Sequence, residues 1–330
     1  MRIGRNLLVM LFVAALSNPV AAANGCFIER QEVKAFIDAM VATHGFERAE
    51  LETIIGAATY QPRIIELMTR PAEAKPWFEY RPIFLTDDRI QLGVEFWNQN
   101  NTILNQAEAR FGVDPAVVVA VIGIETKYGR VLGNHRVIDA LMTLAFDYPK
   151  RGREFEGYLE QFLILVRREH MNPLDLMGSY AGAMGMGQFM PGSYIEYAVD
   201  FDGDGIRNLW SNHSDVIGSV ANYLSRHGWE AGGPIADPVR DNAGSQRLIE
   251  KPGLKPVYPL SQMRDWGYSP VSDFSDDSLL STLISLENRD SMEQWLGFQN
   301  FYVITRYNHS PLYAMAVYQL SREIKDQRQR

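Results

Sequence analysis

One segment restricts the possible folds more than any other, the apolar run VDPAVVVAVIGIETKYG at residues 113–129. Asp114 suits the N-cap of a helix, Pro115 suits the first helical position, and Gly129 suits the C-terminal stop. The helix predicted between them is apolar on nearly every side, which is typical of a helix buried inside a bundle. We therefore expect other helices to surround it.

Amphipathic periodicity predicts these other helices. They are EVKAFIDAMVATHG, which stops at Gly45, then AELETIIGAA, a long DDRIQLGVEFWNQNNTILNQAEARFG, REFEGYLEQFLILVRREH, and SDVIGSVANYLSRHG, capped by Ser214. The proline-bearing RPAEAKPWFEYRP is predicted to be an irregular connection. After Trp229 prolines become frequent, and STLISLE and FQNFYVITRYN favour short strands, before SPLYAMAVYQLSREIKD returns to helix behind Ser310 and Pro311.

A chain of 330 residues is too long for one ordinary core, so we expect two or three packed subdomains. The predicted fold class is α+β and predominantly α-helical. The expected division is a signal peptide at 1–23, an N-terminal helical subdomain at 24–85, a helical core at 86–230, a small β-containing subdomain at 231–300, and a segment at 301–330 that returns to the core.

The N-terminus has the pattern of a secretory signal: two arginines in MRIGR, the short apolar run NLLVMLFVAAL, and small residues up to Ala23. We expect cleavage near Ala23 and an exported, periplasmic protein. The single cysteine, Cys26, excludes an intrachain disulfide. It leaves two readings open: an unpaired thiol in a loose tail, or a lipid-modified N-terminus that would be the one route to membrane attachment. The preceding ANG matches a lipoprotein signal poorly.

The charge of the chain argues against nucleic acid as a partner. The formal net charge is −8, and the chain has no block of lysine or arginine that could follow a phosphate backbone. A zinc enzyme is not indicated either, because the histidines form no ligand-spaced pair. They are His44, His135, His170, His213, His227 and His309.

Glu125 is the first candidate for chemistry, since it is a carboxylate at the end of the apolar helix. Burial and the negative end of the helix dipole should both raise its pKa, and a protonated acid near neutral pH can protonate a glycosidic oxygen. The structural alternative is a glutamate paired with Lys127, Arg130 or Arg136. This segment alone does not decide between them.

The second candidate is the glycine-rich GSYAGAMGMGQFMPGSY at 178–194. Ser179, Gln188 and Tyr194 offer neutral hydrogen-bonding groups beside apolar side chains, which suits the apolar faces and polar rims of a sugar. The glycines are Gly178, Gly182, Gly185, Gly187 and Gly192. They allow close approach of a ligand, or equally a small-residue contact between helices. No lysine follows them, so this is not a phosphate loop.

The third candidate is DFDGDGIRNLW at 200–210, which matches the first half of an EF-hand calcium loop. Asp200, Asp202 and Asp204 alternate, and the Ile206 carbonyl would be a backbone ligand. Position twelve is Ser211 instead of glutamate, so Asp215 is the candidate for the closing carboxylate. The alternative is a solvent-exposed turn without an ion.

Together these segments resemble the lytic murein transglycosylase B family, which cleaves peptidoglycan on a lysozyme-like core. The resemblance rests on GIETKYGR, LMTLAFDYP, the 178–194 segment, YAVDFDGDGIRNLW, IGSVANYL and VITRYNHSPLYAMAVYQL, in a fixed order over residues 80–320. It implies that residues 86–230 form the lysozyme-like catalytic core, and that peptidoglycan glycan strands are the substrate. Cell-wall synthesis proteins are a further expected class of partner.

The resemblance also implies roles for single residues. Glu125 matches the catalytic glutamate; the substrate groove would be formed by Ser179, Gln188, Tyr80, Tyr307 and Asn308. Calcium would be structural and bound by Asp200, Asp202, Asp204, Ile206 and Asp215, although WSNHSD is one residue longer than the family pattern. No cofactor is expected for the chemistry itself.

The implied reaction is non-hydrolytic. Glu125 would act first as acid and then as base, and would leave 1,6-anhydroMurNAc ends. Two rival functions stay open. A lysozyme-type hydrolase would need a second carboxylate, for which Asp139, Asp147 and Glu154 are candidates. A non-catalytic, calcium-stabilised wall-binding protein would need no acid at all.

Overall fold

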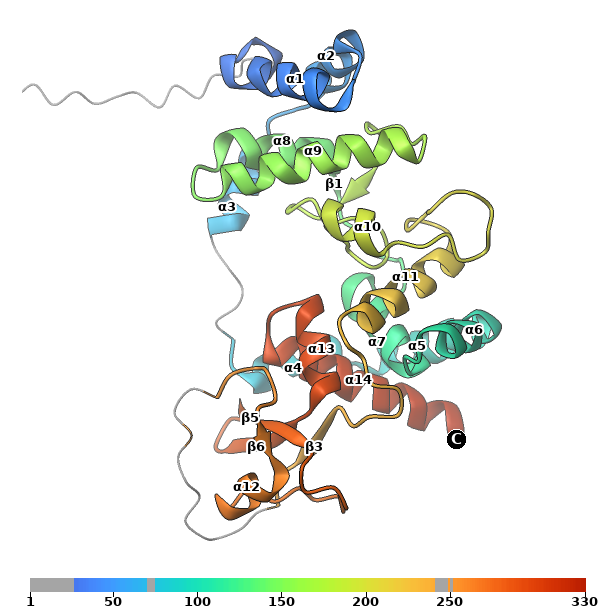
Figure 1. Ribbon diagram of the computed structural model, residues 1–330, viewed down its shortest axis with the longest axis vertical. Helices are drawn as coiled ribbons and strands as arrows, with labels where there is room; N and C mark the ends of the chain where they lie inside the picture. Colours follow the sequence, from blue (N-terminus) through green and yellow to red (C-terminus); the bar gives the residue numbers. More distant parts are fainter. Residues whose placement is uncertain (1–26, 70–74, 241–248, 250–251) are drawn as a thin grey trace, which may run out of the picture.

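A computed structural model describes residues 27–69, 75–240, 249 and 252–330 of the chain. The predicted signal peptide and Cys26 lie outside the described residues. The structure is predominantly helical with two small antiparallel sheets, which confirms the predicted fold class (Figure 1). Within the described part, no helix is long and apolar enough to cross a membrane.

The N-terminal helices agree closely with their predicted positions. A short 3-10 helix, η1 (Phe27–Glu29), precedes α1 (Gln31–His44) and α2 (Arg48–Gly56). Helix α1 ends at Gly45, whose φ of 62° is the left-handed conformation that glycine adopts without strain. An ion pair between Arg30 and Asp147, at 2.9 Å, joins this region to helix α8 (Val137–Asp147).

The connection predicted between residues 70 and 82 is wrong in its second half. Helix α3 (Pro62–Thr69) is followed by α4 (Trp77–Phe84), which contains Pro82. Two interactions compensate for the proline. Trp77 is buried in the core, and Arg89 donates hydrogen bonds to the carbonyls of Ile83 and Phe84, at 2.6 and 2.9 Å, where the helix ends. Tertiary contacts thus outweigh a local helix breaker.

The long helix predicted from residue 87 to 112 is also wrong, because it is two helices. Helix α5 (Asp87–Gln99) ends at the buried Asn100, and α6 (Asn101–Phe111) follows at once. The Asn100 amide donates to the Phe96 carbonyl at 2.8 Å, and its oxygen lies 3.1 Å from the His213 ring nitrogen. The Asn100 side chain binds a carbonyl of the last turn of α5, and asparagine side chains often compete in this way with the backbone hydrogen bonds of a helix. The helix is therefore interrupted at this residue.

Helix α7 (Pro115–Thr126) is the buried helix predicted from the apolar run. Asp114 caps it by accepting from the Ala116 amide at 2.8 Å, and nearly all of its side chains are buried. Helices α5, α6, α11 (His213–Arg226) and α14 (Pro311–Gln329) pack around it (Figure 1). Each buried valine or isoleucine contributes about 1.5–3 kcal/mol, so this helix anchors the core. It ends at Lys127, two residues before the predicted stop, in the left-handed conformation.

Two further helices, α8 and α9 (Gly152–Arg168), lie side by side (Figure 1). A two-stranded sheet of β1 (His135–Arg136) and β2 (Met177–Gly178) lies next to them, and α10 (Pro191–Tyr197) packs on α9. The N-cap predicted at Ser214 is wrong. Asn212 caps α11 instead, because its side-chain oxygen accepts from the Ser214 amide at 2.9 Å.

The C-terminal third forms a four-stranded antiparallel sheet with its own small core. The strand order is β3 (Ala236–Pro238), β6 (Met292–Gly297), β5 (Leu280–Glu287), β4 (Tyr258–Pro259), and α12 (Leu260–Asp265) covers it. Strand β5 confirms the prediction from STLISLE. The small core consists of Leu260, Met263, Tyr268, Leu283, Leu296 and Phe298.

The strand predicted from FQNFYVITRYN is wrong, because α13 (Gln299–Tyr307) occupies this segment. Its aromatic and β-branched residues favour a strand locally. However, Phe301, Val303 and Ile304 are fully buried, and the Asn300 side chain binds the backbone of Glu230 at 2.8 Å. Packing therefore selects the helix. Helix α14 then follows where it was predicted, behind Ser310, whose hydroxyl accepts from the Tyr313 amide at 3.3 Å.

Candidate active site

Glu125 lies in the last turn of α7, and the residue as a whole is half-buried. Tyr313, in the first turn of α14, donates a hydrogen bond from its hydroxyl to Glu125 Oε1 at 2.6 Å. Burial raises the pKa of Glu125 to about 7, although the Tyr313 hydrogen bond acts to lower it. A carboxyl with this pKa exchanges its proton readily near neutral pH.

The ion pairs considered for Glu125 in the sequence do not form. Lys127 pairs with Asp88 at 2.6 Å, and Arg136 pairs with Asp139 at 2.8 Å. Among the residues that the structure describes, no cation lies within ion-pair distance of Glu125. Glu125 is therefore a buried acid hydrogen-bonded to a neutral tyrosine, and the structural explanation for it has no support.

Two stacked tyrosines line one side of the acid. The rings of Tyr307 and Tyr313 are nearly parallel, with an interplanar angle of 8° and centroids 6.5 Å apart. The Tyr307 hydroxyl donates to the Gly187 carbonyl at 2.5 Å. Burial raises the pKa of both phenols well above 10, so both stay neutral donors. Tyr307 was predicted as a groove residue, whereas Tyr313 was missed, since no local pattern marks it.

The glycine-rich segment reaches the same site at Gly187, whose carbonyl accepts from Tyr307, and Gln188 follows Gly187 directly. Gln188 has a φ of 51°, unusual for a residue with a side chain, and its amide donates to the carbonyls of Leu132 and Gly185 at 3.2 and 2.9 Å. The Met186 carbonyl accepts from the Thr126 hydroxyl at 2.9 Å. Since Thr126 follows Glu125 directly, this contact ties the segment to the end of α7.

The other predicted groove residues take different positions. The Ser179 hydroxyl accepts from the amides of Ala181 and Ala183, at 3.3 and 3.0 Å, at the start of the glycine-rich segment. Tyr80 is close enough to Tyr313 to help raise its pKa. Asn308 is exposed and follows Tyr307 directly, at the end of α13. By contrast, Tyr194 is fully buried and its hydroxyl donates to the Arg207 carbonyl, so it is a core residue and not a sugar ligand.

The three carboxylates considered as second catalytic groups are engaged elsewhere. Asp139 is buried, accepts two hydrogen bonds from Arg136 and also accepts one from the Thr59 amide at 2.9 Å. Asp147 binds Arg30 through both oxygens. Glu154 binds Arg151, and its pKa is lowered mainly by that hydrogen bond. Each therefore has a structural role.

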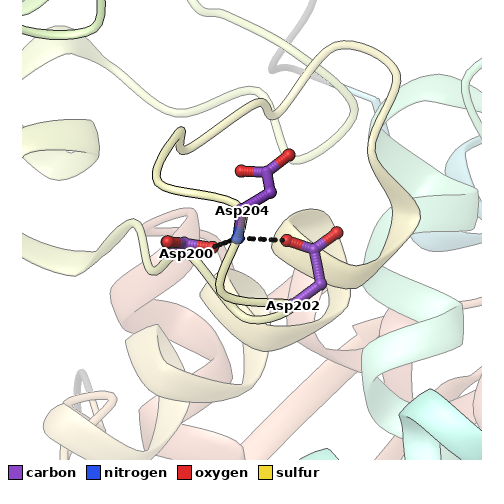
Figure 2. A group of neighbouring side chains, drawn as sticks. All are labelled: Asp200, Asp202 and Asp204. Carbon is purple, nitrogen blue, oxygen red and sulfur yellow. Dashed lines mark hydrogen bonds between the residues drawn. The ribbon is translucent and has the colours of Figure 1, made fainter.

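The aspartates of the candidate calcium loop lie close together: Asp200 and Asp202 both accept from the backbone amide of Asp204, at 3.1 and 3.3 Å, while the Asp204 side chain extends away from that amide (Figure 2). Carboxylate oxygens of Asp200, Asp202 and Asp204 all lie within 4.8 Å of one another. Backbone amides of Gly203 and Gly205 donate to Asp200 at 2.7 and 2.9 Å, which holds the turn in shape. Three oxygen donors at this spacing fit a hard cation such as Ca²⁺.

Asp215 behaves differently from the ligand that the sequence suggested. It is buried in the first turn of α11, and its two oxygens accept from the amides of Phe201 and Asn208 at 2.8 and 2.7 Å. It thereby fastens both ends of the loop to the helix. The cluster formed by described residues contains the three aspartates and not Asp215.

The chain matches the model of the transglycosylase SLT domain family over residues 29–322. It is 43% identical over 323 residues to the membrane-bound lytic murein transglycosylase B of Escherichia coli K12, which covers 95% of this chain and 88% of that protein.

Solved structures show the same likeness. The soluble lytic transglycosylase SltB1 of Pseudomonas aeruginosa has a TM-score of 0.85 at 43% identity, covering 91% of this chain and 100% of that one. Slt35 of E. coli in complex with calcium has a TM-score of 0.86 at 44% identity, with coverages of 93% and 96%. SltB3 of P. aeruginosa in complex with NAG-NAM-pentapeptide has a TM-score of 0.80 at 31% identity, with coverages of 91% and 80%. The chain therefore belongs to the transglycosylase SLT domain family, and it is a lytic transglycosylase that acts on peptidoglycan.

Proposed function

We propose that Glu125 alone carries out both proton transfers of a non-hydrolytic cleavage of the MurNAc-β-1,4-GlcNAc bond. The observation that carries this proposal is its carboxyl group, with a pKa of about 7 and the Tyr313 hydroxyl as hydrogen-bond partner. In the first step the protonated Glu125 donates its proton to the glycosidic oxygen. The bond from C1 of MurNAc to that oxygen breaks, and GlcNAc leaves as an alcohol.

The second step returns the proton to Glu125. The carboxylate accepts the proton of the C6 hydroxyl of the same MurNAc, and the C6 oxygen bonds to C1 to form a 1,6-anhydro ring. The proton given up in the first step is thus recovered, and no water is consumed. Since the nucleophile belongs to the substrate, its effective molarity exceeds that of a free partner. Tyr313 donates to the carboxylate between the steps and stabilises it.

A hydrolase would need a second carboxylate to activate water or attack C1. Asp139, Asp147 and Glu154 are held in ion pairs on α8 and α9, which supports the single-carboxylate reaction over hydrolysis. We assign substrate binding to the five polar, uncharged residues that the resemblance implies, because their hydroxyl and amide groups suit a sugar's polar rim. These are Ser179, Gln188, Tyr80, Tyr307 and Asn308.

We further propose that the aspartate loop binds Ca²⁺ through Asp200, Asp202, Asp204 and the Ile206 carbonyl. The loop lies in sequence between the glycine-rich segment and α11, so the ion would stabilise the fold and take no part in the chemistry. Asp215 supports the loop through its backbone contacts. The calcium complex of Slt35 supports this assignment.

The expected cellular setting follows from the N-terminus. We propose an exported, periplasmic enzyme that acts on peptide-bearing glycan strands, in line with the NAG-NAM-pentapeptide complex of SltB3. The E. coli relative is described as membrane-bound. Lipidation of Cys26 would attach this chain to the outer membrane. Cell-wall synthesis proteins stay an expected class of partner.

The test is the product profile of Glu125→Gln on purified sacculi, read by mass spectrometry. Wild-type protein should release ends lighter by one water than reducing ends, and the variant should release none while keeping its fold. Glu154→Gln is the matched control and should stay active. Reducing ends from wild-type protein would establish a hydrolase, and turnover by Glu125→Gln would remove Glu125 from the mechanism.

A further inference from the structure

A cleft of about 580 Å³ lies between α4, α14 and the β5–β6 hairpin, which sit next to one another in Figure 1. Its volume is in the range of ligand-binding pockets. The reaction proposed above uses none of its lining residues. Arg322, in its wall, lies nine residues after Tyr313 on α14, or about two and a half helical turns. The cleft therefore faces the opposite side of α14 from Glu125.

One wall of the cleft is aromatic and held in a fixed orientation. Trp295 and Tyr318 pack edge to face, with centroids 6.0 Å apart. The Trp295 indole nitrogen donates to Glu293 at 2.7 Å, and the Asn288 amide donates to the other Glu293 oxygen at 3.2 Å. Glu293 is thus occupied in holding the indole, whose face can receive the apolar part of a ligand.

The cleft also contains cations that have neutral partners. Arg81 donates from Nε to the Gln319 side chain at 2.7 Å, and Arg322 donates to the Tyr318 hydroxyl at 3.2 Å. In the part of the chain that the structure describes, neither guanidinium has a carboxylate oxygen within ion-pair distance. The remaining donors of both guanidinium groups can bind a carboxylate.

Carboxylates complete the lining of the same cleft. Glu323 follows Arg322 directly on α14, Asp326 lies four residues after Arg322, and both acids border the cleft. A ligand that matches this arrangement carries free carboxylates for the arginines and an ammonium group for the acids. It also needs an extended, partly apolar backbone for the indole. A short zwitterionic peptide has all of these features.

We propose that this cleft binds the stem peptide of a peptidoglycan strand other than the strand being cleaved. The inference rests on the proposed function, since peptidoglycan supplies such a peptide beside its glycan. The position of the cleft on the opposite side of α14 favours a neighbouring strand over the one at Glu125. Binding there would hold the enzyme on a cross-linked wall and raise the local concentration of glycan at the active site.

The first test measures binding of a soluble stem pentapeptide by calorimetry and by tryptophan fluorescence. Arg81→Ala/Arg322→Ala should weaken the affinity at least tenfold, and Arg81→Lys/Arg322→Lys should retain part of it. Arg63→Ala is a matched control, because this exposed arginine pairs with Glu66 on α3. Equal affinity for the pentapeptide in all variants, or no binding by wild-type protein, would overturn the proposal. A charged segment of another protein would then be the alternative ligand of the cleft.

The second test compares the rate of glycan release from intact sacculi with that from sacculi stripped of peptides by an amidase. Wild-type protein should prefer the intact material, and the double alanine variant should lose this preference. A preference unchanged in the variant would contradict the inference. Absence of anhydro ends would instead contradict the proposed function, while peptide binding in the first test would still stand.

Discussion

Tyr313→Phe is the substitution that tests the chemistry of the site most directly. It removes the hydroxyl that lies 2.6 Å from Glu125 Oε1 and keeps the ring stacked on Tyr307. A hydrogen bond to a charged group is worth about 1.5–3 kcal/mol. The protonated form of Glu125 also accepts a hydrogen bond from Tyr313, so the hydroxyl stabilises the ionised form over the protonated form by less than this amount. A net loss of about 1.4 kcal/mol corresponds to one pKa unit.

The sign of the effect follows from which form of Glu125 the hydroxyl stabilises. Tyr313 lowers the pKa of Glu125, so its removal should raise that pKa from about 7 to about 8. Because the first step needs the protonated acid, kcat/KM falls as pH rises through this pKa. The falling limb of the profile should therefore move up by about one pH unit. The weaker acid should also lower kcat about tenfold at pH 5.

The assay is the pH profile of kcat/KM, measured by quantifying anhydro ends released from soluble glycan strands. Tyr194→Phe is the control, since it removes a buried hydroxyl that binds the Arg207 carbonyl. Its midpoint should match that of wild-type protein. A Tyr313→Phe profile with the wild-type midpoint would refute the reasoning, because Tyr313 would then not act on the acid.

Three further predictions concern stability. The pKa of Glu125 is raised in the folded protein, so folding favours its protonated form. The free energy of unfolding of wild-type protein should therefore fall by about 2–3 kcal/mol between pH 4.5 and a pH above 7. Glu125→Gln should lack this loss, and chemical denaturation at both pH values measures it. A chelator should lower the melting temperature of wild-type protein and leave that of Asp202→Asn unchanged; an equal response of both would contradict a calcium site at this loop. Gly133→Ala should destabilise by several kcal/mol, because the added Cβ would lie 1.9 Å from the Gly178 carbonyl; Gly157→Ala on α9, with no atom within 4 Å, should be neutral or stabilising.

The local sequence predicted those parts of the fold whose signal is contained in adjacent residues. The run at 113–129 predicted a buried helix, because a helix with apolar side chains on all sides is stable only inside the protein. The N-caps at Asp114 and Ser310 and the stop at Gly45 rest on contacts with near neighbours in the chain. The aspartate loop is equally local, since its carboxylates converge within five residues.

The errors arose where packing overrides local preference. Residues 299–307 have the composition of a strand, yet burial of Phe301 and Ile304 and the binding of Asn300 to the Glu230 backbone stabilise a helix. Helix α4 likewise forms across Pro82 because Trp77 is buried and Arg89 satisfies the carbonyls at its end. Neither set of contacts can be read from the segment itself.

The same distinction applies to the active site. The residues around Glu125 marked it as an acid in apolar surroundings, which was enough to predict its raised pKa, whereas the resemblance implied its catalytic role. Its hydrogen-bond partner is Tyr313, 188 residues away. Asp139 and Asp147, which were considered as second catalytic carboxylates, form ion pairs with Arg136 and Arg30 instead. The raised pKa was therefore encoded locally, as burial of a carboxyl in an apolar helix. Which groups meet that carboxyl was decided by the tertiary fold, since it alone brings α7, α13 and α14 together.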